Sequence, residues 1–378
     1  MIGLLQEDFS LTGGVEAVTK RLVESFLRAG KEIKVYSCKQ KNIKKKEGYE
    51  VKVLGITSFR KKEAEKFASL LRYDNVNDLI VQLNGPYSIM ANKNLFKKLY
   101  ATEINIFVVI HNSPKAFITV YNNPVESKII HLIKQIRMKL YLKRRNKKLF
   151  SYINKYVNFV TISQGNHDEL KKYYGIESFI IPNFYDVSDS LPVNFKKIHS
   201  LAFIGRFDFC QKNILFLLDA WNCVENKGDW FFTILGDDDV QSQEIIKKYV
   251  RRHNISNVII KGVLTTDKIK SFLSTNSILL LGSNYEGFPT VVLEAGVHRN
   301  VIISTKYDGF SEEILKNNIN CYVVDFDVHK FSNSIQYLIS NEQVYEKFQK
   351  ETVFIVNEYL QHDVLKQWDN IFNRSCKL

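Results

Sequence analysis

One short segment in the second half of the chain carries residues well suited to binding chemistry. It follows the apolar run SILLLG, which predicts a strand, and reads EGFPTVVLE over residues 286–294. Gly287 and Pro289 predict a tight loop, and we expect a helix to begin near Thr290 with unpaired N–H groups in its first turn. Glu286 in the loop and Glu294 in the helix could accept hydrogen bonds from sugar hydroxyls, while the helix start could face phosphate. The segment therefore favours a ligand with both groups.

Two cations follow another predicted strand. Arg206 comes directly after the run LAFIG, and Lys212 lies six residues later, where a helix is expected to begin. The carboxyl ends of strands in doubly wound sheets face the ligand crevice, and a forked cation beside a point-like one suits a diphosphate. Taken alone, the pair is also compatible with ordinary solvated loop residues.

Two weaker candidates lie nearer the amino terminus. Gly13 and Gly14 separate the first predicted strand from a helix, where bare backbone can approach an anion, although a tight turn explains them equally well. They do not form the G-x-G-x-x-G pattern of dinucleotide-binding proteins. His111 ends the apolar run INIFVVI, and a single histidine at such a place is commonly structural.

The elements that must position these residues alternate between strand and helix. Runs such as MIGLLQ, IKVYSC, NDLIVQL, INIFVVI and NFVTIS predict strands in the first half, and HSLAFIG, WFFTILG, NVIIKG, SILLLG and NVIIST predict them in the second. Such alternation predicts α/β domains with parallel sheets, and 378 residues are enough for two. We expect Rossmann-like domains over residues 1–190 and 191–360. A helical tail over 361–378 should pack back toward the first domain.

The net charge of +13 is unevenly distributed. Residues 1–190 hold 32 Lys and Arg against 18 Asp and Glu, whereas the remainder holds 21 against 22. Residues 127–155 contain ten of these cations and no acid, interleaved with apolar residues, and predict a basic amphipathic helix. An anionic membrane surface is the favoured partner, bound through Lys139, Lys143, Arg144, Arg145, Lys147 and Lys148. A solvated helix face and a nucleic-acid surface remain alternatives, although no recognisable nucleic-acid module accompanies the patch.

Composition excludes several other classes of protein. No run approaches the roughly 18 apolar residues of a membrane span, and the acidic start lacks the basic region of a signal peptide, so we expect a cytoplasmic chain. Five widely spaced cysteines without a C-x-x-C pair argue against a disulfide framework and a zinc site.

Together, the Arg206 and Lys212 pair, the Glu286-x7-Glu294 segment and Gly13-Gly14 resemble the retaining glycosyltransferases of family 4. The resemblance extends from the first loop to at least Val324, and its later motifs are the more specific. It implies the GT-B fold, in which two Rossmann-like doubly wound domains face a central cleft. The first domain would then bind the acceptor and the second the nucleotide-sugar donor.

The resemblance also implies roles for individual residues. Arg206 and Lys212 would hold the donor diphosphate, Glu286 the transferred sugar and Glu294 the ribose, while His111 would lie near the reaction centre. Catalytic roles thus go to Glu286, His111, Arg206 and Lys212. Donor contacts go to Gly13, Gly14, Arg206, Lys212, Gly262, Glu286, Gly287, Phe288, Pro289, Thr290, Val291 and Glu294.

The implied activity is transfer of a sugar, with retention, from a donor that is by default UDP-linked to a glycan or lipid-linked acceptor in surface polysaccharide synthesis. No cofactor and no nucleic acid is expected. The family commonly has Gly-Asp-Gly where this chain reads Gly236-Asp237-Asp238-Asp239, and we expect no metal there because the cations already offset diphosphate charge. A nucleotide-sugar hydrolase or epimerase of the same fold, or a basic nucleic-acid-binding protein, remains an alternative.

Overall fold

The chain folds into two compact units. The computed structural model describes residues 1–9, 13–39, 49–83, 86–121, 128–185, 197–236 and 239–374. The first unit comprises Met1–Val120, Gln135–Asn183 and Gln361–Leu378, and the second comprises Tyr121–Lys134 and Phe184–Leu360. The predicted boundary between residues 190 and 191 lies outside the described residues.

The first unit is built on a seven-stranded sheet in the order β3-β2-β1-β4-β5-β6-β7, with every neighbouring pair parallel. Its direction of winding reverses between β1 and β4, which pair directly although β2 and β3 separate them in sequence. The strands are β1 (Ile2–Gln6), β2 (Ile33–Ser37), β3 (Val51–Val53), β4 (Asp78–Leu83), β5 (Asn105–Ile110), β6 (Asn158–Thr161) and β7 (Phe179–Ile180).

The second unit repeats this plan with a six-stranded parallel sheet in the order β10-β9-β8-β11-β12-β13. Here the reversal falls between β8 and β11. The strands are β8 (Ser200–Ile204), β9 (Phe231–Leu235), β10 (Val258–Lys261), β11 (Ile278–Leu281), β12 (Val301–Thr305) and β13 (Tyr322–Val324). In open sheets of this kind, ligands bind at the carboxyl ends of the strands beside such a reversal.

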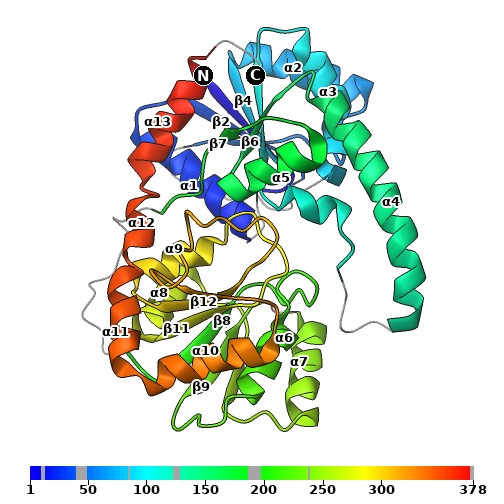
Figure 1. Cartoon of the computed structure of the whole chain (residues 1–378). Helices are drawn as coiled ribbons and strands as arrows, with labels where there is room; N and C mark the ends of the chain where they lie inside the picture. Colours follow the sequence, from blue (N-terminus) through cyan, green and yellow to red (C-terminus); the bar gives the residue numbers. More distant parts are fainter. Residues whose placement is uncertain are drawn as a thin grey trace. The chain divides into compact units, whose positions relative to one another are not determined.

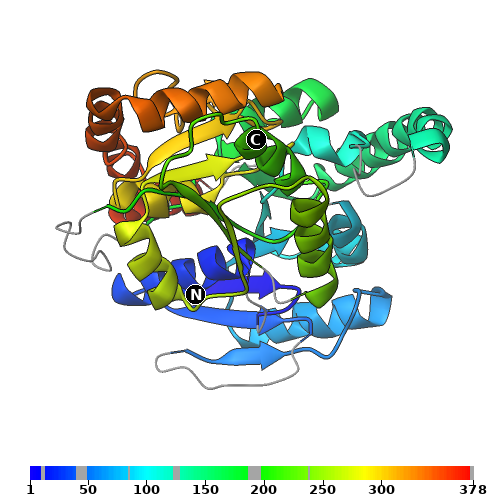
Figure 2. The same cartoon turned by 90° about the horizontal axis from the view of Figure 1, so that it is seen from below.

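Helices cover both faces of each sheet (Figures 1 and 2). Those of the first unit are α1 (Gly14–Arg28), α2 (Lys61–Tyr73), α3 (Pro86–Tyr100), the 3₁₀ helix η1 (Pro114–Ile118), α5 (Gln164–Tyr174) and α13 (Gln361–Phe372). Those of the second are α6 (Ile214–Asn222), α7 (Val240–Arg252), α8 (Thr266–Thr275), α9 (Thr290–Val297), α10 (Val328–Ser340), α11 (Glu342–Glu351) and α12 (Phe354–Asn357). The long helix α4 (Lys128–Ile153) has residues in both units.

Helix α1 shows how the sequence forms these elements. Val18, Leu22 and Phe26 recur at helical spacing and are buried, so one face of the helix packs on the sheet. The helix stops at Gly30, whose φ of +73° is the left-handed conformation that glycine adopts readily.

The last helix belongs to the first unit. The indole ring of Trp368 in α13 lies 6.5 Å from the ring of Phe26 in α1 and 6.2 Å from that of Phe107 in β5. Lys31 Nζ and Asp369 Oδ1 add an ion pair at 2.5 Å at the surface of this contact. These aromatic contacts bury Trp368. The sequence alone did not predict which residues it would contact.

The α/β class with two parallel sheets is confirmed, as are the ten strands that the apolar runs predict. Strands β3, β7 and β13 were not predicted. They contain three, two and three residues, which is too short for a period-two pattern to appear. Each forms by pairing with one neighbouring strand, β2, β6 or β12, and the sequence of a short segment does not reveal such a pairing.

Candidate functional site

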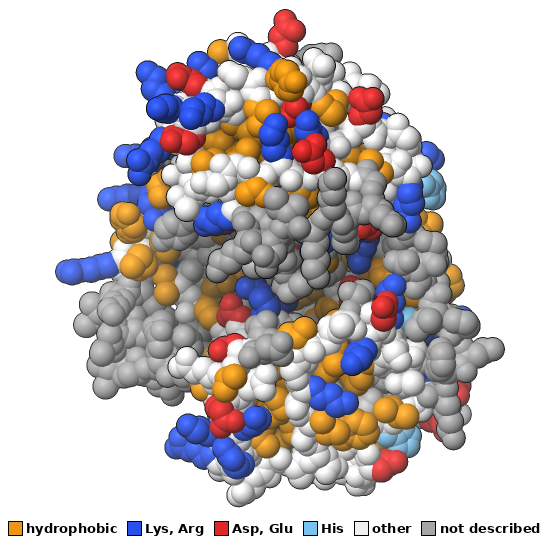
Figure 3. Space-filling view, turned by 180° about the vertical axis from the view of Figure 1, so that it is seen from behind, with side chains coloured by type: hydrophobic (Ala, Val, Ile, Leu, Met, Phe, Trp, Pro, Cys, Tyr) orange, Lys and Arg blue, Asp and Glu red, His pale blue; other side chains and the backbone are white. Residues whose placement is uncertain are grey.

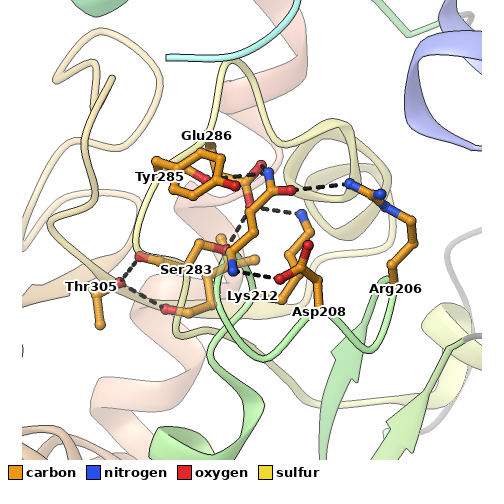
Figure 4. A network of polar contacts seen from close by, with 9 residues as sticks. Arg206, Asp208, Lys212, Ser283, Tyr285, Glu286 and Thr305 are labelled. Atoms are coloured by element: carbon orange, nitrogen blue, oxygen red, sulfur yellow. Dashed lines mark hydrogen bonds and ion pairs between the residues drawn. The ribbon is translucent and has the colours of Figure 1, made fainter. Parts of the chain in front are cut away.

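The second sheet places two charged loops side by side at its winding reversal. The strand β8 leads into Gly205 and Arg206, and β11 leads into the loop that carries Ser283 and Glu286. Since β8 and β11 are neighbours in the parallel sheet, both loops emerge at the same edge. Figure 4 shows the resulting polar network.

A tight turn after β8 orients the second cation. Asp208 Oδ1 accepts hydrogen bonds from the backbone N–H groups of Cys210, at 2.9 Å, and Gln211, at 2.7 Å. The carbonyl of Asp208 accepts one from the N–H of Lys212 at 2.9 Å. The turn directs Lys212 toward the Glu286 loop just before α6 begins.

Lys212 and Glu286 form a largely buried ion pair. Lys212 Nζ lies 2.6 Å from Glu286 Oε1, and the two side chains are only 16% and 7% exposed. Ser283 Oγ donates to the same carboxylate oxygen at 2.5 Å, and Gln211 Nε2 lies 3.4 Å from Oε2. Because a buried carboxylate needs a cation and hydrogen-bond donors, these contacts hold Glu286 in one orientation.

Arg206 joins the same network but remains exposed. Its guanidinium donates to Gln211 Oε1 at 3.0 Å, so Gln211 bridges Arg206 and Glu286. The structure thus brings together Arg206, Lys212 and Glu286, three residues that the sequence analysis selected from loops about 80 residues apart. Gln211 was missed, because a glutamine in a loop has no pattern to mark it.

Further support for the Glu286 loop comes from backbone contacts. The N–H of Glu286 donates to the carbonyl of Asp308 at 3.0 Å, and Asp308 returns a bond from its own N–H to Asn284 at 2.9 Å. Thr305 Oγ1 donates to the carbonyl of Ser283 at 2.9 Å. Sequence reasoning also missed Ser283, Thr305 and Asp308 as supports, since these contacts join separate strands.

The helix α9 begins where the sequence predicts. Pro289 is its N-cap and supplies no side-chain hydrogen bond, so the N–H groups of the first turn are not capped by that residue. Gly287, Phe288 and Pro289 are buried, and the ring of Phe288 packs edge-on to Tyr359 at 5.1 Å. Within this helix, Val291 is buried, while Thr290 and Glu294 are half-buried.

The glycine that directly follows β9, Gly236, is required by close packing. A Cβ at this position would lie 2.3 Å from the carbonyl oxygen of Gly205 and equally close to the Phe207 ring, so only glycine fits beside the Arg206 loop. Asp239 caps α7 by accepting from the N–H groups of Gln241 and Ser242. Asp237 and Asp238 lie outside the described residues. Among the residues that are described, no group of three or more His, Cys, Asp or Glu could hold a metal ion.

The remaining predicted donor contacts lie elsewhere. Gly262 follows β10, the edge strand that β9 separates from β8. Gly13 and Gly14 begin α1 in the first unit, with Gly13 as an extended N-cap. His111 follows β5 in that unit, where it is buried and its Nε2 bonds to Gln82 Oε1. Burial lowers the pKa of His111 to about 4, so the imidazole is neutral near pH 7.

The basic segment is helical, as predicted, and forms α4. Lys139, Lys143, Arg144, Lys147 and Lys148 are exposed, whereas Arg145 is half-buried beneath Tyr141, with its guanidinium 5.6 Å from that ring. Figure 3 shows Lys and Arg side chains with hydrophobic ones among them on this side of the molecule.

The two parts of this helix differ in their surroundings. Asn146, Phe150 and Ile153 are fully buried, and Asn146 Nδ2 donates to the carbonyl of Phe117 at 2.6 Å. Met138, Leu140 and Tyr141 are instead about half exposed, at 46%, 56% and 57%. In the described part of the chain, no helix is both long and apolar enough to cross a bilayer.

Comparison with known proteins supports a common architecture. Residues 198–341 match the family model described as glycosyl transferases group 1, a range that contains Arg206, Lys212 and Glu286. AmsD, an amylovoran biosynthesis glycosyltransferase of Erwinia amylovora, is 27% identical over 215 residues, which make up 53% of this chain and 59% of AmsD. The chain therefore spans less than two thirds of that relative's length.

Two solved structures cover nearly the whole chain. A glycosyltransferase from Rickettsia africae aligns with a TM-score of 0.73 and 16% identity, over 99% of this chain and 98% of that one. HepE of Anabaena, solved in complex with UDP-glucose, aligns with a TM-score of 0.74 and 13% identity, over 98% and 99%. At such identities the likeness establishes the fold, which is GT-B with two parallel-sheet α/β units.

Proposed function

We propose that this protein is a glycosyltransferase that moves a sugar from a nucleotide-sugar donor, by default UDP-linked, to a glycan or lipid-linked acceptor. The observation that carries the proposal is the buried Lys212–Glu286 pair beside exposed Arg206, at the winding reversal of the second sheet. The match of this unit to group 1 glycosyl transferases supports the same assignment.

The cations and the start of α9 suit the leaving group. As the bond between the anomeric carbon and the phosphate oxygen breaks, negative charge grows on the departing nucleoside diphosphate. Arg206, Lys212 and the first N–H groups of α9 would stabilise that charge, an effect worth roughly 3–4 kcal/mol for each well-placed donor.

The carboxylates suit the uncharged parts of the donor. Glu286 is already held by Lys212, Ser283 and Gln211, so it can accept hydroxyl hydrogen bonds from the transferred sugar without reorienting. Glu294, about one turn into α9, would accept from the ribose hydroxyls.

We assign His111, Gly13 and Gly14 to the reaction centre and the diphosphate only through family resemblance. The same resemblance underlies our proposal of retention without a metal. In that reaction the acceptor oxygen bonds to the anomeric carbon on the face that the phosphate leaves, and the acceptor proton passes to a leaving phosphate oxygen. His111 would contribute as a neutral hydrogen-bonding group, since burial keeps its pKa low.

We further propose that the enzyme works in polysaccharide synthesis on the cytoplasmic face of a membrane. The exposed stretch of α4 supports this proposal because it combines cations with Met138, Leu140 and Tyr141. Apolar side chains among cations are typical of helices that lie in a lipid interface.

Product analysis with labelled donors tests the activity. Purified protein should release UDP, GDP or ADP from one nucleotide sugar of a panel, and release should increase when a glycan acceptor mixture is added. Release that ignores every acceptor would indicate a hydrolase. Interconversion of the sugar without release would indicate an epimerase, and either result would overturn the proposal.

A further inference from the structure

One tyrosine supports the loop of Glu286 from a distant part of the sequence. Tyr121 belongs to the second unit, although Val120 before it belongs to the first. Its ring stacks on that of Tyr285, with the ring centroids 4.7 Å apart and an interplanar angle of 29°. Its hydroxyl donates a hydrogen bond to Asp308 Oδ2 at 2.5 Å, across 187 residues of sequence. Tyr121 therefore contacts two neighbours of the site at once.

Both partners of Tyr121 are joined to Glu286 through the backbone. Tyr285 directly precedes Glu286 in the loop after β11 (Figure 4). The carbonyl of Asp308 accepts a hydrogen bond from the Glu286 N–H at 3.0 Å, and the N–H of Asp308 donates to the carbonyl of Asn284 at 2.9 Å. The orientation of the Glu286 backbone thus depends on where Tyr285 and Asp308 lie.

Glu286 is held at both its side chain and its main chain. Lys212, Ser283 and Gln211 bind the carboxylate, whereas Asp308 binds the backbone N–H. The contacts to the carboxylate fix only the end of a side chain with rotatable bonds, so the position of the loop also matters. A misplacement of about 1 Å in a site that handles a reacting group can lower the rate about 100-fold.

The contacts of Tyr121 lie outside the fully buried core. Tyr121, Tyr285 and Asp308 are all half-buried, whereas the core of the second unit is built from buried side chains such as Trp221. Removing a half-buried contact lowers stability less than removing a core side chain. We therefore expect the loss of Tyr121 to appear in turnover more than in folding.

We propose that Tyr121 is a positioning residue for the transferred sugar, and that it acts on Glu286 through Tyr285 and Asp308. The inference rests on the proposed function, in which Glu286 accepts hydrogen bonds from the hydroxyls of that sugar. The cations of the site come from another loop, the one after β8, and would serve the diphosphate. Loss of Tyr121 should therefore impair the handling of the sugar and leave binding of the diphosphate nearly unchanged.

Kinetics on the full chain with Tyr121→Ala test the inference. The assays use the donor and acceptor that product analysis identifies, and calorimetry uses the nucleoside diphosphate of that donor. The variant loses both contacts, so kcat should fall about 30-fold while the Kd of the nucleoside diphosphate stays within about threefold of wild type. A kcat within threefold of wild type would overturn the inference. So would a loss of nucleoside diphosphate affinity as large as the loss of kcat, because it would indicate a general collapse of the site.

The variant Tyr121→Phe separates the two contacts. It keeps the stacked ring and removes only the hydrogen bond to Asp308, so kcat should fall about fivefold, less than in Tyr121→Ala. An unchanged kcat in Tyr121→Phe would overturn the inference, because it would show that the bond to Asp308 does not affect turnover.

A double-mutant cycle tests whether Tyr121 acts through Asp308. Asp308→Ala keeps the backbone contacts to the loop of Glu286 and removes the acceptor of the Tyr121 hydroxyl. In that background, Tyr121→Phe should change kcat by less than about twofold, because the bond is already lost. Losses of kcat that multiply would overturn the inference, since they would show that the two residues act independently.

Tyr249→Phe is the matched control. Tyr249 is also half-buried and donates to an aspartate of the same unit, Asp219 Oδ1, at 2.6 Å, but this bond joins α7 to α6. The control should leave kcat within twofold of wild type, and a loss equal to that in Tyr121→Phe would contradict the inference. Wild-type protein that neither binds a nucleoside diphosphate nor transfers sugar would overturn the proposed function. Active wild type with equally active Tyr121 variants would overturn only the role of Tyr121.

Discussion

The two sheets share one topology at their winding reversals but carry opposite kinds of chemistry there. In the second unit, Arg206, Lys212 and Glu286 gather three charges around Gln211. In the first, the equivalent strands β1 and β4 carry the neutral amides of Gln6 and Gln82 near their carboxyl ends. The fold therefore supplies the position of a site, and the few residues that follow each strand decide whether it receives a charged or an uncharged group.

This difference fits the two demands of glycosyl transfer. A departing diphosphate needs cations, whereas the hydroxyl groups of a sugar are uncharged and can be bound by hydrogen-bond donors and acceptors alone. His111, which follows β5 in the first sheet, is likewise uncharged near pH 7, because burial lowers its pKa to about 4.

The largest effect is expected from Lys212→Ala. It leaves the Glu286 carboxylate buried without its cation, so transfer should fall about 1,000-fold and the free energy of unfolding by about 3 kcal/mol. Activity assays and denaturant unfolding measure the two quantities. Lys316→Ala is the matched control, because its pair with Glu358 is exposed and should contribute less than about 1 kcal/mol. If Lys212→Ala transferred sugar within threefold of the wild-type rate, the proposed role of the charged site in the second unit would be contradicted.

Arg206→Ala should lower transfer about 100-fold, because one donor to the leaving group is lost. Stability should change by less than about 0.5 kcal/mol, because Arg206 is exposed. Initial-rate kinetics and thermal unfolding give both values. Arg252→Ala, an exposed arginine at the end of α7, should change neither. An equal loss of rate in that control would point to net charge instead of the site.

The uncharged state of His111 predicts a dependence of stability on pH. Its folded pKa is about 4, below the ordinary 6.5 of the unfolded chain, so protons bind the unfolded state first. This contribution is fully present above pH 6.5 and is lost as the pH falls toward 4, by about 3 kcal/mol in total.

Denaturant unfolding of wild type and His111→Gln across this pH range should show a shallower acid slope in the variant. His298→Gln provides a comparison in the second unit, because burial also lowers the pKa of His298 to about 4. Identical slopes in wild type and His111→Gln would show that folding does not shift the pKa of His111, and would contradict the account.

The smallest effect concerns the exposed part of α4. Replacing Arg144 and Lys147 by Ser should weaken binding to anionic vesicles by about 2 kcal/mol, or roughly 30-fold, since each cation near such a surface contributes about 1 kcal/mol. Vesicle sedimentation measures this loss. The matched control replaces Lys248 and Arg252 of α7, which removes the same charge from the other unit. Equal losses in both variants would favour nonspecific attraction.

Much of this architecture could be predicted from sequence, because long apolar runs alternate with helical patterns. The loop that begins at Glu286 could also be predicted, because Gly287 and Pro289 mark a turn between an apolar strand and a helix. Arg206 could be chosen because it directly follows a predicted strand, and Lys212 because it lies six residues later, where a helix was expected to begin. The role of Gln211 could not be predicted, because it depends on a contact with Glu286, 75 residues away in sequence.

Calorimetric titration with UDP, GDP and ADP, comparing wild type with Lys212→Ala, tests the central claim most directly. We predict that wild type binds one of these nucleotides with a Kd in the micromolar range and that the variant binds it at least 50-fold more weakly. Equal affinities in the two proteins, or no binding of any of the three to wild type, would contradict the assignment of the Arg206, Lys212 and Glu286 cluster to the donor diphosphate.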